Sequence, residues 1–232
     1  MKACAAFWLF ISVVIAGFLF PIAAGAHNVS QRDASFVQSN HGAAVAPFLY
    51  LGAKHMVTGY DHLAFLVGVV FFLYKLKDVV AYVSLFTLGH SITLLAGVFA
   101  NIHANSYIID AIIGFSVIYK AFDNMEGFRR LFGFEPNTKI AVLVFGLFHG
   151  FGLATKLQEL DLARDGLIAN IVSFNVGVEI GQVLALTAIV IVLSWWRTRP
   201  NFFRFAFATN TALMVVGMVL VGYQLTGYFV KT

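Results

Sequence analysis

The sequence predicts an all-α membrane protein, a polytopic bundle of transmembrane helices. Of its 232 residues 60% are hydrophobic and only 11% are charged, whereas a soluble domain carries about 25% charged residues. The hydrophobic residues form runs long enough to span a bilayer, which takes about 20 residues of helix. The basic residues stand between these runs, where they set membrane topology. The pattern indicates a lipid bilayer as the surroundings, and the net charge of +4 does not indicate a nucleic-acid partner.

Residues 1–26 are predicted to be a secretory signal peptide. Lys2 provides a positive start, residues 5–20 form a hydrophobic stretch, and small residues at 24–26 resemble a cleavage site. Cleavage there leaves His27 as the first residue of the mature chain. If the signal is not cleaved, it adds one helix to the bundle.

The mature chain divides into a short tail and a helix bundle. Residues 27–47 are small and polar, and we expect them to form a periplasmic tail. Residues 48–232 are expected to form a bundle of six spans, or seven if the signal remains. The predicted spans are residues 50–74, 79–100, 106–122, 139–156, 167–195 and 202–229.

Charge bias predicts the orientation of this bundle. Export of the mature N-terminus places three predicted loops on the cytoplasmic side, at residues 75–78, 120–139 and 197–204. These loops carry nine Lys or Arg residues, and the predicted outer segments carry five. Because positive residues accumulate on the cytoplasmic side, we expect a multi-pass protein of the bacterial inner membrane with a periplasmic mature N-terminus.

Several ionisable residues lie inside the predicted spans. A charged group at the bilayer centre costs about 2.5–3.5 kcal/mol on insertion scales, so such groups indicate function. His55 and His62 are seven residues apart and share one helix face. Five spans place such groups in their outer halves, which predicts one shared site facing the periplasm. The predicted metal ligands are His55, Asp61, His62, His90, His149 and Glu179.

Imidazole and carboxylate groups together suit a divalent transition metal such as Ni²⁺, Co²⁺ or Zn²⁺. The one cysteine, Cys4, lies near the start of the chain and provides no thiolate in the site. In the tail, His27 and His41 are candidates for accessory metal capture. Residues expected to support or orient the ligands are Asp110, Asn175, Thr58 and Ser91. The alternative is a network of hydrogen bonds between helices that only holds the bundle together.

Four motifs resemble those of the HupE/UreJ family, in its divergent second branch. They cover roughly residues 50–185, and the first is His55-x5-Asp61-His62. The others are Gly89-His90-Ser91-Ile92-Thr93, Phe148-His149-Gly150-Phe151-Gly152 and Phe174-Asn175-x-Gly177-x-Glu179-x-Gly181-Gln182. The chain departs from the usual family pattern at Met56, where that pattern has proline. The resemblance implies an accessory membrane protein of hydrogenase or urease systems, regarded as a nickel permease.

Three functions remain open at this point. The first is a permease that imports a divalent metal, with metalloenzyme maturation or respiratory proteins as partners. The second is an intramembrane metal-dependent hydrolase in which Glu179 acts as general base. The third is a non-transporting accessory subunit of a metalloenzyme system. The absence of a His-Glu-x-x-His motif favours a transporter over an enzyme.

Overall fold

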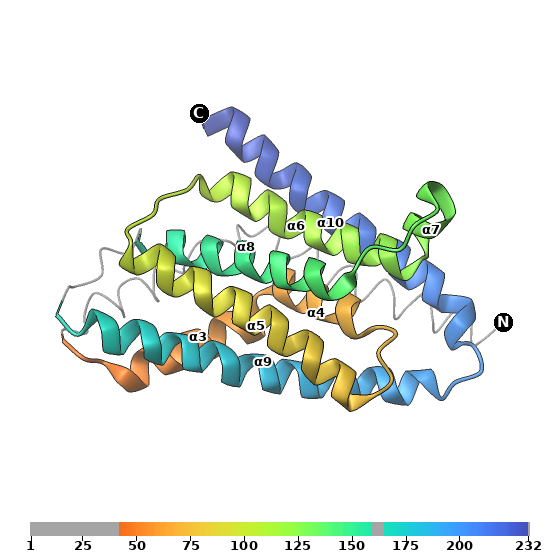
Figure 1. Cartoon of the computed structure of the whole chain (residues 1–232), viewed down its shortest axis with the longest axis horizontal. Helices are drawn as coiled ribbons and strands as arrows, with labels where there is room; N and C mark the ends of the chain where they lie inside the picture. The colour runs from red at the N-terminus through yellow and green to blue at the C-terminus, as the bar shows by residue number, and fades with distance from the viewer. Residues whose placement is uncertain (1–41, 159–164, 232) are drawn as a thin grey trace.

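A computed structural model describes residues 42–158 and 165–231, and within these ranges the chain is helical without strands. The predicted signal peptide, His27 and His41 lie outside the described residues. Figure 1 shows the helices running roughly alongside one another. They are α3 (Val45–Thr58), α4 (Tyr60–Val70), α5 (Leu76–Phe99), α6 (Ser106–Asn124), α7 (Gly127–Phe132), α8 (Thr138–Gln158), α9 (Leu167–Arg197) and α10 (Phe202–Lys231).

The first predicted span is two helices rather than one. Helices α3 and α4 meet at Gly59, whose extended backbone (φ −72°, ψ 97°) interrupts the helical path. The amide of Gly59 still donates to the carbonyl of His55, at 2.8 Å. Glycine is a poor helix former, and a broken helix is tolerated in a membrane where it is buried in protein.

Among the described residues, four helices are long and apolar enough to cross a membrane: α5, α8, α9 and α10. Helix α6 has 19 residues but carries Asp110, Lys120 and Asp123. Helices α3 and α4 have 14 and 11 residues, so that each is short for a span and the two together follow the path predicted for one. The fold is thus that of an α-helical membrane protein.

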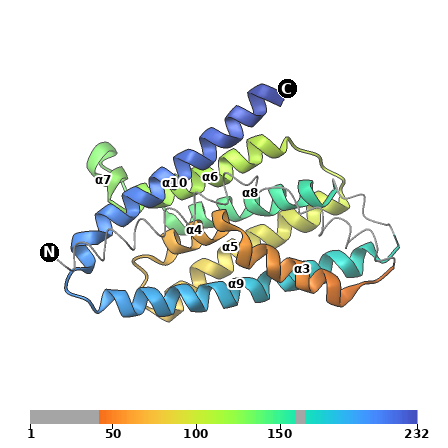
Figure 2. The same cartoon turned by 180° about the vertical axis from the view of Figure 1, so that it is seen from behind.

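The helix connections gather at two ends of the bundle. Figures 1 and 2 show the α4–α5, α6–α8 and α9–α10 connections at one end, with the short helix α7. We call it the basic end, because Lys75, Arg129, Arg130 and Arg199 lie in or beside these connections. The α5–α6 connection and the start of α3 lie at the opposite end. The described connections between successive spans therefore alternate between the two ends of the bundle, as the sequence predicts.

Glycines allow two pairs of helices to pack closely. A Cβ on Gly150 of α8 would lie 2.0 Å from the carbonyl oxygen of His90 in α5. A Cβ on Gly177 of α9 would lie 2.0 Å from the carbonyl oxygen of Leu49 in α3. These glycines bring the backbones together, as small residues do in membrane helix pairs. Figure 2 shows α3 beside α9.

Helix α4 ends inside the bundle, and Arg197 of α9 satisfies its last carbonyl groups. The guanidinium donates to the carbonyls of Phe71 at 2.8 Å and Leu73 at 3.0 Å, and also to that of Val70. The final carbonyls of a helix have no partner within the helix. Arg197 therefore fixes the end of the short helix that carries His62.

Candidate metal centre

Four histidines from four helices meet in the middle of the bundle. They are His55 of α3, His62 of α4, His90 of α5 and His149 of α8. The ring centroid of His62 lies 5.0 Å from that of His55, 4.9 Å from that of His149 and 6.2 Å from that of His90. Two imidazoles on one ion, each with a metal–nitrogen distance of about 2.1 Å, have centroids about 5–6 Å apart. The spacing therefore suits a shared ion.

The break at Gly59 brings two of these rings together. His55 lies in the last turn of α3, and His62 lies in the first turn of α4. The Asp61 carboxylate accepts hydrogen bonds from the backbone amide of His62 at 2.9 Å and from its Nδ1 at 3.0 Å. This arrangement leaves the lone pair of neutral His62 on Nε2. Carboxylates orient metal-binding histidines in this way.

His149 is oriented by its own helix. Its Nδ1 donates to the carbonyl of Phe145 at 2.8 Å, so the lone pair of the neutral ring lies on Nε2. The close approach at Gly150 sets α8 against α5 beside His90. The ring of Phe86 stacks on that of His90 with centroids 6.1 Å apart. His62 and His149 therefore both keep Nε2 available for a ligand.

The buried ring nitrogens lack partners in the part of the chain that the structure describes. His62 Nε2, His149 Nε2 and both ring nitrogens of His90 are buried and form no hydrogen bond there. The exposed fractions are 3% for His62, 1% for His90 and 1% for His149. A buried polar group without a partner costs about 1–3 kcal/mol. The unpartnered nitrogens of these residues therefore fit a metal ion as a partner.

The cluster is not a finished coordination sphere. Among the described residues, no group of three or more His, Cys, Asp or Glu side chains is arranged to hold a metal ion. The ring planes of His62 and His149 are inclined by 72°, and those of His62 and His55 by 77°. Binding of an ion thus requires the rings to turn until three or more nitrogens point at one centre.

Glu179, the remaining predicted ligand, shows no contact with the histidines among the described residues. Its side chain is on the exposed face of α9, where it makes no ion pair or hydrogen bond with the described residues. Asn175, four residues earlier, turns towards α5 and donates to the hydroxyl of Ser91 at 3.0 Å. The structure brings together four histidines and Asp61, but not Glu179.

Asp110 and Thr58, which were also predicted to support the site, form their hydrogen bonds and ion pairs with residues other than the histidines. Asp110 of α6 forms an ion pair with Lys156 of α8, at 2.9 Å, and Gln224 of α10 donates to the same carboxylate at 3.4 Å. Thr58 is exposed, and its hydroxyl donates to the carbonyl of Lys54 at 2.8 Å. Asp110 therefore joins three helices, whereas Thr58 caps the end of α3.

Four further polar residues join neighbouring helices and were not among the predicted site residues: Lys156, Gln182, Asn210 and Gln224. Gln182 accepts a hydrogen bond from Thr87 of α5 at 2.7 Å, and Asn210 accepts one from Asn124 at 2.9 Å. Lys156 is the last residue of the predicted span 139–156, and its ammonium forms an ion pair with Asp110. Gln182, Asn210 and Gln224 are polar residues within hydrophobic runs, and this feature of the sequence could have identified them.

Comparison with known proteins gives a family for the whole bundle. A family model described as HupE / UreJ protein matches residues 31–232, which include every described helix. Neither the curated proteins nor the solved structures provide a match. Membership of this family implies an accessory membrane protein that is associated with nickel or cobalt. The chain belongs to the HupE/UreJ family.

Proposed function

We propose that this protein imports a divalent transition metal across the bacterial inner membrane. Ni²⁺ is the first candidate, followed by Co²⁺ and Zn²⁺. The observation that carries the proposal is the group of buried imidazole nitrogens without partners on His62, His90 and His149. Imidazole ligands favour these ions over Mg²⁺ and Ca²⁺, which prefer oxygen.

In this proposal each residue of the cluster has a distinct task. His62 and His149 bind the ion through Nε2, because Nδ1 of each ring donates to a carbonyl or carboxylate oxygen. His90 and His55 complete the set, and Asp61 orients His62. His55 is half-buried and the other three histidines are buried, so the ion enters past His55.

The orientation follows from charge. We assign the basic end to the cytoplasm and the mature N-terminus to the periplasm, in line with the positive-inside rule. An inside-negative membrane potential of 100 mV favours inward movement of a monovalent cation by a free energy of about 2.3 kcal/mol, and of a divalent cation by about 4.6 kcal/mol. The imported ion would then be available to maturation proteins of nickel enzymes, the partners that family membership favours.

The test is uptake of Ni²⁺ into liposomes that contain the purified protein, with an imposed inside-negative potential and a metal-sensitive dye inside. The His62→Ala/His149→Ala double variant is expected to lose uptake. His103→Ala is the matched control, because His103 is exposed in the α5–α6 connection. Equal uptake by wild type, double variant and protein-free liposomes contradicts the proposal.

A further inference from the structure

Each of the three buried histidines has a phenylalanine one helical turn away on its own helix, towards the basic end. The pairs are His62 with Phe65 in α4, His90 with Phe86 in α5, and His149 with Phe145 in α8. Residues three or four apart lie on one helix face. Helix α4 runs towards the basic end, whereas α5 and α8 run away from it. The three phenylalanines therefore form one layer, which we call the phenylalanine layer.

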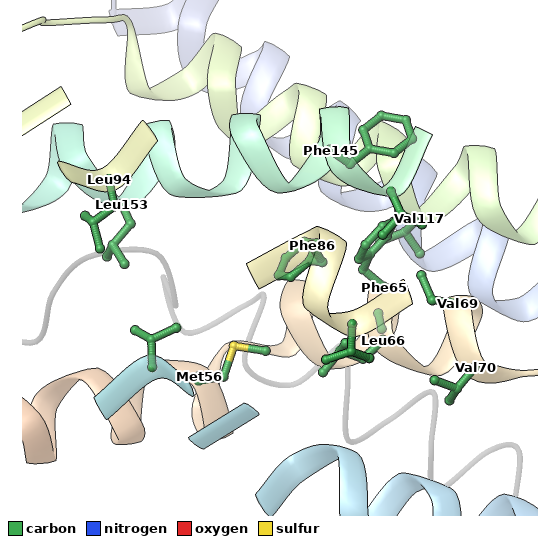
Figure 3. Packing of buried hydrophobic residues seen from close by; sticks show 14 of the residues in the cluster. Met56, Phe65, Leu66, Val69, Val70, Phe86, Leu94, Val117, Phe145 and Leu153 are labelled. Carbon is green, nitrogen blue, oxygen red and sulfur yellow. The ribbon is translucent and has the colours of Figure 1, made fainter. Parts of the chain in front are cut away.

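The members of this layer contact one another and the histidines. The ring centroid of Phe65 lies 5.3 Å from that of Phe86 and 5.9 Å from that of Phe145. The centroid of His149 lies 5.3 Å from that of Phe65 and 5.0 Å from that of Phe86. Figure 3 shows Phe65, Phe86 and Phe145 near one another, each on a different helix.

The rings of the layer are buried, and polar groups lie on either side of it along α4. The exposed fractions are 1% for Phe65, 2% for Phe86 and 8% for Phe145. One turn further along α4, the carbonyl of Gly68 accepts a hydrogen bond from Asn124 at 2.8 Å. Positions 62, 65 and 68 of α4 thus carry an imidazole, an aromatic ring and a hydrogen-bonded carbonyl, in that order towards the basic end.

We infer that the phenylalanine layer is the inner gate of the permease, an inference that rests on the proposed function. A dry apolar constriction stops an ion, because the ion would lose its ligands and its water without replacement. An ion held by the histidines reaches the polar groups near Gly68 only after these rings part. Phe65 and Phe86 also pack on His149. If the His149 ring rotates when the metal binds, it therefore moves the rings of the gate.

The test compares alanine variants at Phe65, Phe86 and Phe145 with a matched control, Phe48→Ala. Phe48 is also a buried phenylalanine, at 2% exposure, but it lies in α3, on the far side of the histidines from the layer. Ni²⁺ binding is measured by calorimetry in detergent, and potential-driven Ni²⁺ uptake is measured in liposomes. Phe145→Ala, which removes the most exposed of the three rings, keeps the test valid if the other variants do not fold.

The gate variants that still bind Ni²⁺ are expected to take it up about tenfold faster than Phe48→Ala, which corresponds to a barrier lower by about 1.4 kcal/mol. If the variants that bind Ni²⁺ take it up no faster than Phe48→Ala, the gate is overturned while the permease stands. If wild type neither binds nor takes up Ni²⁺, the proposed function fails, and the gate fails with it.

Discussion

The Nδ1 atom of His62 lies 3.0 Å from Oδ1 of Asp61, and both side chains are buried in the middle of the bundle. The carboxylate therefore keeps the proton on Nδ1 and leaves the lone pair on Nε2, in a ring whose centroid lies 4.9 Å from that of His149. In the proposed function, Asp61 therefore acts on the metal through His62.

Replacing Asp61 by asparagine tests that role. The amide of Asp61→Asn can present its NH₂ group to Nδ1 and so favour the wrong tautomer. We expect Ni²⁺ affinity to fall by about 10–100-fold, the usual effect of removing a partner of a ligating histidine. Calorimetry measures this change, and Asp78→Asn, in the first turn of α5 at the basic end, is the control. Equal affinities for wild type and Asp61→Asn would show that the pair does not serve metal binding.

Gly150→Ala is expected to push α8 away from α5. The added Cβ would lie 2.0 Å from the carbonyl oxygen of His90, which is backbone and cannot rotate away. Overpacking of this kind costs about 1–3 kcal/mol, and the shift would also separate His90 from His149. Thermal unfolding in detergent and Ni²⁺ binding are the measurements. A Cβ on Gly222 meets nothing within 4 Å, so Gly222→Ala should behave like wild type; similar behaviour of both variants would contradict the close packing.

The ion pair between Lys156 and Asp110 joins α8 to α6. Both side chains are largely buried, with exposed fractions of 13% and 5%. Lys156→Met leaves the Asp110 carboxylate without its cation, and loss of one partner of a buried pair costs about 3–5 kcal/mol. We expect a marked fall in thermal stability, which Asp110→Asn should partly reverse in the double variant. Additive losses in the double variant would show that the two groups are not coupled.

Glu179→Gln is expected to leave Ni²⁺ binding unchanged, because the Glu179 side chain is exposed on α9 and makes no hydrogen bond or ion pair with the described residues. His149→Ala in the same assay should weaken binding strongly. If Glu179→Gln lowers affinity as much as His149→Ala does, the carboxylate reaches the ion in the metal-bound state. That result would support the ligand set predicted from the sequence, which includes Glu179.

Much of the helical organisation was predictable, because hydrophobic runs of bilayer length specify helices almost by themselves. The break in the first span at Gly59 could not be predicted, because glycine is common within membrane helices and the sequence is hydrophobic on both sides of it. The grouping of the four histidines followed from their similar depth. The exposure of Glu179 on α9 was not predictable, because the sequence pattern does not say which side of a helix its neighbours cover.

The direct test of the central claim is the metal content and Ni²⁺ binding of the detergent-purified protein, compared with the His62→Ala/His149→Ala double variant. Elemental analysis and calorimetry are the measurements, and thermal unfolding confirms that the variant is folded. We predict near-stoichiometric Ni²⁺, Co²⁺ or Zn²⁺ in the wild type and loss of that metal in the variant. Equal binding by both proteins, or none by either, would contradict a metal centre built on these histidines.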